Sequence, residues 1–368
     1  MAWNALWTRF ESASLDERVA LVHGEIDAQT LDSEGAWELC NELADPLVRG
    51  GRLAELEALF ARIERECPEV WKDNAGYFTR QLAMGKVQTG APGQLEAVLR
   101  LGEHFVKVID SAQHLVDYLR FHGRSDLLEP LLAAAWPSVR DSDNVMDWGK
   151  ESLLGLLVEM VIDRHRAAKP SLAADDPALL DDLEPLFDEH GRQKLVELVG
   201  PWVTRAARTW TGVDFQQSAN LNGLLLHFTA ALESRWGFHG LRAGLVRESL
   251  ARWVARPREP KPDDRRGSRS RSAASALLAV TPRSVRELVD EHSHGIAFES
   301  HTLAAALLAL PHWTEFLSEQ GLVERSAAEG AFRTFRGQAR VELADVLVRR
   351  LEAEDPIAAA AVRAAFSE

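Results

Sequence analysis

The chain has few cysteines, no long apolar run and no excess of basic residues. Its 368 residues include two cysteines, Cys40 and Cys67, so a disulfide framework is excluded and a reducing compartment is favoured. We interpret both as small packing residues. No segment approaches the ~20 apolar residues that span a bilayer, and residues 1–18 lack the regions of a secretory signal. The sequence therefore predicts a cytoplasmic protein without membrane contact.

Motifs of the common catalytic and cofactor sites are also missing. The sequence contains no Gly-x-Ser-x-Gly, His-Glu-x-x-His, Gly-x-x-x-x-Gly-Lys or Gly-x-Gly-x-x-Gly pattern, so the usual nucleophile, zinc, phosphate and dinucleotide sites are not indicated. A catalytic triad built from distant residues leaves no such pattern, because it is defined in space. We expect no cofactor, and an enzyme stays an open alternative.

Composition and charge are those of a folded protein. The 42 basic and 56 acidic residues give a formal net charge of −14, which argues against general affinity for nucleic acid or anionic membranes. The hydrophobic content of 46% suffices for a core, and 27% charged residues with 15 prolines do not suggest global disorder. A chain of this length is expected to form two units or one elongated array.

Apolar residues recur at helical spacing along the chain. The first helix is indicated by Trp3, Leu6, Trp7 and Phe10, at positions i, i+3, i+4 and i+7. A capping box over residues 14–17 precedes a second helix. Further helices are predicted over residues 33–48, 53–67, 152–165, 201–210, 221–236, 241–254, 282–295, 303–310 and 326–351, and from 356 onward. No strand pair is predicted, so the fold class is all-α.

Glycine and proline set two of these helix ends. The helix over 33–48, with Trp37 on its buried face, is expected to end at Gly50-Gly51, because glycine takes the left-handed C-terminal conformation without strain. The helix over 303–310 is expected to end at Pro311, which cannot donate a backbone hydrogen bond.

The pattern that follows Gly51 recurs twice. Gly51-Arg52 is followed by a glutamate at residue 57, and the same spacing returns at Gly123-Arg124 with Glu129 and at Gly191-Arg192 with Glu197. The glycines are 72 and 68 residues apart, about twice the ~34 residues of a helix-pair repeat. A weaker copy follows the turn at residues 90–93. The sequence thus predicts helix pairs over residues 33–205, each burying one face against its neighbours.

The first helix pair resembles the tetratricopeptide-repeat-like class of α-solenoids. The residues that fit are Leu43, Ala44, Leu47, Gly51, Phe60 and Pro68, and in the second copy Leu115, Leu119, Gly123, Leu132 and Ala135. Leu56 and Ile63 stand where the family prefers small residues, and Arg140 stands at the second copy's terminal proline position. The resemblance covers about half of the chain. It implies a non-catalytic scaffold, an adaptor or regulatory subunit that binds a partner protein on a concave face.

Four residues on or beside the helices that flank the repeat turns are the predicted contacts of that partner. They are Arg80, Arg120, Arg124 and Trp148. Arginine and aromatic side chains are effective anchors at protein interfaces.

Residues 256–272 mark the clearest boundary. They hold three prolines, alternating serine and arginine, and seven basic against three acidic residues, which is typical of a flexible connector. The predicted domains are a solenoid over 1–255, a linker over 256–272 and a C-terminal helical domain over 273–368. As alternatives, the linker binds nucleic acid or docks on the acidic segment 175–189. The linker has no aromatic residue for base stacking, which disfavours RNA.

A histidine cluster gives a further alternative function. His292, His294 and His301 lie near Asp290 and Glu299, and imidazoles with carboxylates suit zinc or iron. The chain would then be a metal-dependent enzyme or effector. Against this, His292 and His294 are two residues apart and point to different sides of a helix. The competing interpretation is a polar helix end, where histidines interact with the helix dipole.

Overall fold

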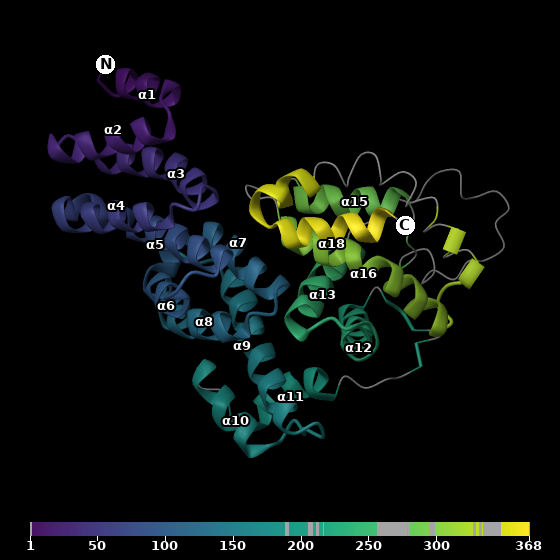
Figure 1. Ribbon diagram of the computed structural model, residues 1–368. Helices are drawn as coiled ribbons and strands as arrows, with labels where there is room; N and C mark the ends of the chain where they lie inside the picture. The colour runs from purple at the N-terminus through teal and green to yellow at the C-terminus, as the bar shows by residue number, and fades with distance from the viewer. Residues whose placement is uncertain are drawn as a thin grey trace. The chain divides into compact units, whose positions relative to one another are not determined.

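The computed structural model describes residues 2–187, 191–204, 209–210, 213–215, 217–255, 278, 280, 282–293, 299–326, 329–330, 333 and 347–367. These residues form helices joined by turns, with no strand among them, which confirms the predicted all-α class (Figure 1). In this part of the chain no helix combines the length and the apolar character needed to cross a membrane. Packing divides the chain into two compact units, Met1–Leu115 with Asp126–Leu153, and Val116–Ser125 with Leu154–Glu368.

The first unit is a succession of helices around its own apolar core. Its elements are α1 (Ala2–Ser12), α2 (Leu15–Asp27), α3 (Ser33–Arg49), α4 (Leu53–Glu66), α5 (Pro68–Thr89), α6 (Gln94–His104), η1 (Phe105–Val108), the first part of α7 (Ile109–Phe121), α8 (Ser125–Arg140) and the start of α9 (Asp147–Ala168). Helix α5 packs on α3, α4 and α6. Ser14 caps α2 through the predicted capping box with Glu17.

The connections from α3 to α4, from α5 to α6 and from α7 to α8 share one kind of turn. Gly51, Gly90 and Gly123 each have a positive φ, of 70°, 67° and 68°. In each turn the following residue donates its N–H to a carbonyl five residues earlier, as Arg52 does to Leu47 at 2.8 Å. Only glycine takes this conformation without steric cost, so the turn predicted at Gly51 is confirmed.

Charged residues beside the first turn join α4 to its neighbours. Arg52 bonds Asp16 at 2.6 Å, just inside α2, and Glu57 bonds Lys86 of α5 at 2.5 Å. Arg192, the counterpart of Arg52 in the third copy of the pattern, pairs with Asp181. Arg52 therefore links the start of α4 to α2, and Arg192 links α11 to α10.

The second unit is organised around one buried helix. Its elements are the end of α7, most of α9, α10 (Pro177–Leu183), η2 (Glu184–Leu186), α11 (Arg192–Thr204), α12 (Ser218–Trp236), α13 (Gly240–Ala255), α15 (Pro282–Ser293), α16 (Ser300–Glu319) and α18 (Pro356–Ser367). Helix α16 packs against α12, α13, α15 and α18. The core around it includes Phe228, Trp253, Trp313 and Phe316.

Three sequence predictions need correction. Helix α16 does not end at Pro311 but continues to Glu319, because Trp313 and Phe316 beyond the proline are buried in the core. The start of the helix predicted over 201–210 belongs to α11, which is described as far as Thr204, and Trp210 is not helical. Trp37 is not on the buried face of α3, since 41% of it is exposed.

The domain boundary predicted at 256–272 lies outside the described residues, so the linker stays a prediction. The packing groups differ from the predicted 1–255 array. Helices α12 and α13 share one core with α15, α16 and α18, and residues from 154 onward form one unit with the end of α7.

Candidate functional site

Helices α3 and α5 of the first unit lie side by side and form a face with matched side chains. Three pairs join them, each 40 residues apart in sequence: Ser33 with Asp73, Trp37 with Tyr77, and Asn41 with Gln81. The constant offset, at four-residue steps on both helices, shows that α3 and α5 run parallel in register. We call this surface the α3–α5 face.

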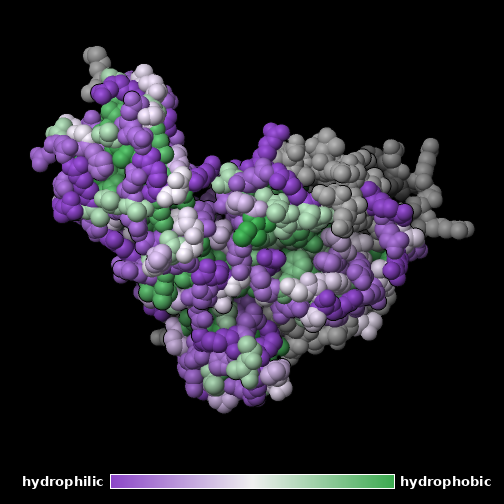
Figure 2. All heavy atoms as spheres, viewed as in Figure 1, coloured by the Kyte–Doolittle hydropathy of each residue, from purple (hydrophilic) through white to green (hydrophobic). Residues whose placement is uncertain are grey.

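An aromatic pair stands at the middle of the α3–α5 face. The rings of Trp37 and Tyr77 are edge to face, with centroids 6.1 Å apart and an interplanar angle of 72°. Buried positions on α3 follow from Ala36 through Leu39 and Cys40 to Leu47, which leaves Trp37 at the edge of the stripe. Most of the surface in view is hydrophilic, with apolar residues in smaller patches (Figure 2). The indole of Trp37 is 41% exposed, so it offers apolar surface at this point of the face.

Next to this aromatic pair, α5 carries polar atoms whose hydrogen bonds are not filled. Arg80 Nε and Gln81 Oε1 are buried and have no hydrogen-bond partner among the described residues. The remaining contact of the guanidinium is long, 3.5 Å from Nη1 to the carbonyl of Ser111. Burial lowers the pKa of Arg80, an effect that Asp45 and Tyr77 oppose. A buried polar atom without a partner costs free energy, so a ligand that supplied an acceptor to Arg80 would bind favourably.

Trp148, a second predicted contact, is exposed in the first turn of α9. It is 67% exposed, beside Met146, which is 68% exposed, and its indole N–H donates to the Met146 sulfur at 3.1 Å. Of these two predicted contacts, Trp148 on α9 is exposed and Arg80 on α5 is half-buried.

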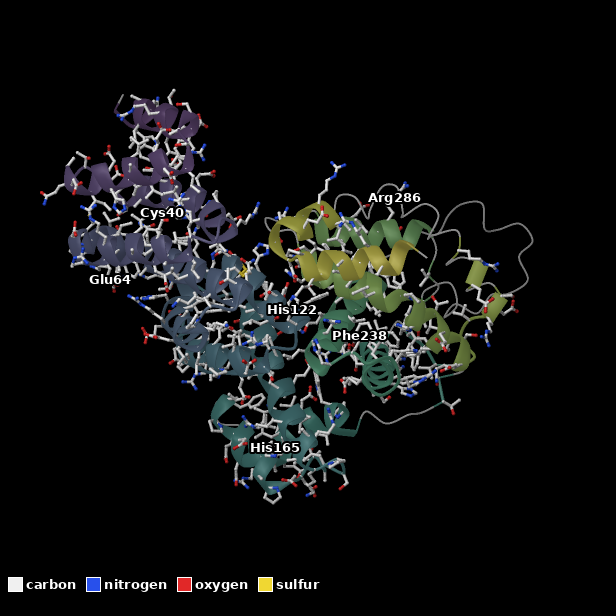
Figure 3. All side chains as sticks on the ribbon, viewed as in Figure 1. Cys40, Glu64, His122, His165, Phe238 and Arg286 are labelled. Atoms are coloured by element: carbon white, nitrogen blue, oxygen red, sulfur yellow. The ribbon has the colours of Figure 1, made fainter. Side chains whose placement is uncertain are left out.

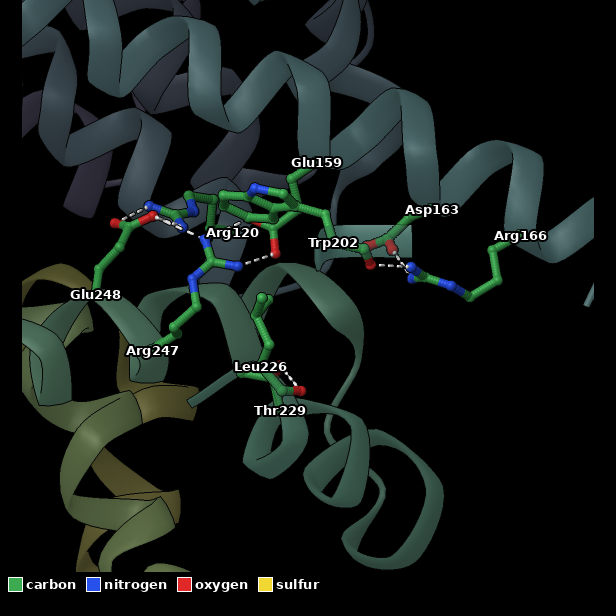
Figure 4. A network of polar contacts seen from close by, with 9 residues as sticks. All are labelled: Arg120, Glu159, Asp163, Arg166, Trp202, Leu226, Thr229, Arg247 and Glu248. Atoms are coloured by element: carbon green, nitrogen blue, oxygen red, sulfur yellow. Dashed lines mark hydrogen bonds and ion pairs between the residues drawn. The ribbon is translucent and has the colours of Figure 1, made fainter. Parts of the chain in front are cut away.

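Arg120, by contrast, is an internal residue of the second unit (Figure 4). It is 2% exposed and binds both carboxylate oxygens of Glu248, at 2.8 and 2.6 Å. A second bidentate pair, Arg247 with Glu159 at 2.9 and 3.0 Å, lies beside it. Trp202 covers the guanidinium of Arg247, 4.3 Å from its ring centroid. Arg120 is thus buried and neutralised by the half-buried Glu248 of its own unit, so Arg120 is not kept in the proposed contact set.

Arg124 follows the Gly123 turn and is half-buried. Its charge lowers the pKa of Tyr118, six residues earlier in α7, against the larger effects of burial and Asp355. It therefore lies beside the histidine cluster of the second unit rather than on the α3–α5 face.

That cluster brings His122, His301 and Asp355 together (Figure 3 labels His122). Asp355 Oδ2 accepts a hydrogen bond from Nε2 of His122 at 2.5 Å and from Nε2 of His301 at 3.0 Å. The ligand atoms of all three residues lie within 4.8 Å of one another. His122 follows α7, His301 is in the first turn of α16, and Asp355 precedes α18.

The carboxylate of Asp355 is fixed at both oxygens. Oδ1 accepts from the backbone N–H groups of Ile357 and Ala358, each at 3.1 Å, and so caps α18. Burial alone would raise the pKa of Asp355, but the bonds from His122 and His301 outweigh it, and the pKa lies below its ordinary value. Burial, and to a smaller extent the same carboxylate, raise the pKa of Tyr118 to about 12.

A second histidine, His292 of α15, has a relay of its own. Its Nδ1 donates to Glu299 at 2.6 Å, and its Nε2 then accepts from the hydroxyl of Ser249 at 2.7 Å. Arg252 holds Glu299 with two bonds, at 3.0 and 2.6 Å.

This relay has the atom order of a nucleophile, base and acid. However, Ser249 is fully buried in the interior of α13, where backbone N–H groups are committed to the helix and offer no oxyanion hole. The Ser249–His292–Glu299 relay therefore serves to join α13 to α15.

Of the three histidines of the predicted metal site, His292, His294 and His301, the two that are described lie in these separate arrangements. His292 binds Glu299 and His301 binds Asp355, while His294 lies outside the described residues, so a site of all three stays a prediction. Sequence reasoning missed His122 and Asp355. Asp355-Pro356 was recognisable as a helix start, yet no local pattern connects it with a histidine 233 residues away.

The acidic segment 175–189 forms ion pairs with nearby helices. Lys169 binds Asp176 at 2.6 Å, and Arg164 and His165 bind Asp182 at 2.9 and 2.8 Å. These carboxylates are neutralised by their own unit, whereas residues 188–190 and the 256–272 segment lie outside the described part. Docking between the two segments stays a prediction.

Comparisons of the chain with protein-family models, with curated proteins and with solved structures found no match. The function is therefore argued from the geometry of the described residues.

Proposed function

We propose that the chain is a non-catalytic scaffold, an adaptor or regulatory subunit, that binds a segment of a partner protein along the α3–α5 face. The observation that carries the proposal is the exposed Trp37 on Tyr77, beside the buried, unfilled polar atoms of Arg80 and Gln81. Tryptophan, tyrosine and arginine are the residues that most often dominate the free energy of protein–protein binding.

The chemistry of the α3–α5 face indicates what the segment contains. Trp37 offers an apolar surface for an aliphatic or aromatic side chain. Arg80 has an unfilled donor and favours a carboxylate or a backbone carbonyl as acceptor. We therefore propose a partner segment with an apolar residue close to an acidic one. Because Arg80 Nε is already out of contact with water, a bond to it forms at low desolvation cost.

Two further observations support a repeat-type scaffold. The connections from α3 to α4, from α5 to α6 and from α7 to α8 each contain the glycine turn, and α3 and α5 run parallel with a constant offset of 40 residues. Parallel first helices in successive pairs are what a tetratricopeptide-like solenoid would have. Both cysteines are free, which favours a reducing compartment, and the cytoplasm is the location we propose.

Site-specific photo-crosslinking in cells of the native host tests the proposal. A photoreactive phenylalanine analogue at residue 37 preserves an aromatic side chain, and the same analogue at Ala58, which is exposed on α4, is the control. We expect residue 37 to yield one dominant crosslinked protein, and that protein to bind the purified chain in stoichiometric amount. Equal crosslinking from residues 37 and 58, or a captured protein that does not bind the purified chain, would refute the proposal.

A further inference from the structure

We propose that His122, His301 and Asp355 bind one divalent transition-metal ion in the second unit, zinc or the chemically similar ferrous iron. Three separate segments bring these side chains together, and their ligand atoms all lie within 4.8 Å of one another. Two imidazole nitrogens and one carboxylate oxygen form a donor set of intermediate softness, which suits these ions in sites with three protein ligands.

The donor atoms already converge on one point. Both Nε2 atoms face Asp355 Oδ2, at 2.5 and 3.0 Å. In a tetrahedral zinc site with bonds near 2.0–2.1 Å, ligand atoms lie about 3.3 Å apart. The two Nε2–Oδ2 distances therefore lengthen by about 0.3 and 0.8 Å when the ion binds, and the two Nε2 atoms, which lie within 4.8 Å of each other, settle at the same separation. Each neutral imidazole then coordinates through Nε2 and carries its proton on Nδ1.

The surroundings hold the ligands in position. Asp355 Oδ1 is fixed by the first N–H groups of α18, which leaves Oδ2 for the ion. The ring of Tyr118 lies 4.5 Å from that of His122 and 5.3 Å from that of His301, between centroids. Phe121 contacts both imidazoles as well, at 5.3 and 5.6 Å. Such outer contacts orient metal ligands and maintain affinity.

A structural role alone does not account for this arrangement. Capping α18 uses Oδ1, and the two imidazoles that meet at Oδ2 are not needed for the cap. His301 and Asp355 are 2% exposed, whereas the His122 side chain is 16% exposed, which gives an ion an entry path at His122. Three ligands also leave a coordination position for water.

Titration of the metal-free full chain with Co²⁺, a spectroscopic probe for zinc sites, tests the proposal, and competition with Zn²⁺ and Fe²⁺ identifies the preferred ion. We expect one equivalent of Co²⁺ to bind with visible absorption bands of a nitrogen and oxygen site. His122→Gln is expected to weaken binding at least about tenfold. Asp355→Asn keeps an oxygen to cap α18 and is also expected to weaken Co²⁺ binding at least about tenfold. If one of the two variants folds poorly, the other still tests the proposal.

His165→Gln is the matched control. His165 also donates to an aspartate, Asp182, at 2.8 Å, but no second imidazole meets that carboxylate among the described residues. The affinity of His165→Gln for Co²⁺ should equal that of the wild type. As a second measurement, Zn²⁺ should raise the Tm of the wild type and of His165→Gln but not of His122→Gln. Absence of stoichiometric binding to the wild type, or equal binding by His122→Gln, would overturn the proposal.

Discussion

At the scale of single residues, the buried ion pairs of the second unit are tolerated only when both members are present. Arg247 and Glu159 are 11% and 3% exposed in their side chains and bind each other twice. A buried ion pair adds little net stability when whole, because both ions lose their hydration. Removing Glu159 is costly, since the Arg247 charge then stays buried with only a long contact, 3.8 Å, to Glu248.

Glu159→Gln is therefore expected to lower the free energy of unfolding by about 3 kcal/mol or more. The control is Glu57→Gln, which breaks the Lys86 pair of a carboxylate whose side chain is 40% exposed and should cost less than about 1 kcal/mol. Chemical denaturation of both variants gives the comparison. Equal losses would show that Arg247 is solvated once Glu159 is removed.

The neighbouring Glu248 makes stability depend on pH. Burial opposes its ionisation, but the Arg120 guanidinium outweighs this, and the pKa of Glu248 lies below its ordinary value of 4.5. Because the folded-state pKa is the lower one, the carboxylate stabilises the fold above about pH 4.5 and loses that contribution as the pH falls further. Between about pH 5 and pH 3, the free energy of unfolding should fall more steeply for the wild type than for Glu248→Gln. Parallel curves would contradict this assignment.

At the scale of helices, the spacing of residues in the sequence does not reveal how closely two helices pack. Gly102 of α6 lies against α8, and a Cβ there would come within 2.6 Å of the Ala134 Cβ and 3.2 Å of the Leu131 carbonyl. Gly24 of α2 has nothing within 4 Å of the same position. Two helical glycines of one unit therefore have opposite roles.

Gly102→Ala is expected to lower the free energy of unfolding by about 1–3 kcal/mol, because α6 and α8 must separate. Gly24→Ala should instead raise it by about 0.5–1 kcal/mol, since alanine loses less conformational entropy in a helix. Thermal or urea unfolding measures both. A stabilising Gly102→Ala would mean that α6 and α8 pack less closely than described.

Helices were largely predictable from the sequence because their signals are local. Apolar spacing, the Ser14 capping box and the Gly51 turn each depend on residues within a few positions. The helix end predicted at Pro311 was wrong because the effect of this proline on α16 is decided by distant packing, around the buried Trp313. The prediction that Trp37 is buried was wrong because the position of its side chain depends on Tyr77 of another helix.

At the scale of the whole molecule, the sites consist of residues far apart in sequence. Asp355 meets His122 and His301 across 233 and 54 residues, and neither spacing leaves a pattern in one sequence. The α3–α5 face was foreseen only through Arg80, because the repeat pattern located the helices and not the side that stays open. Local periodicity thus predicted the helices, whereas the sites could be found only from the packing of each unit.

The central claim is that Trp37 anchors a partner protein on the α3–α5 face. The most direct test is the Kd of the partner captured at residue 37, measured with the wild type, Trp37→Ala and Leu99→Ala. Trp37 and Leu99 are almost equally exposed, at 41% and 40%, but Leu99 is on α6. We predict a loss of affinity of about 30-fold or more for Trp37→Ala and less than about threefold for Leu99→Ala. Unchanged affinity of Trp37→Ala, or an equal loss in both variants, would contradict the account.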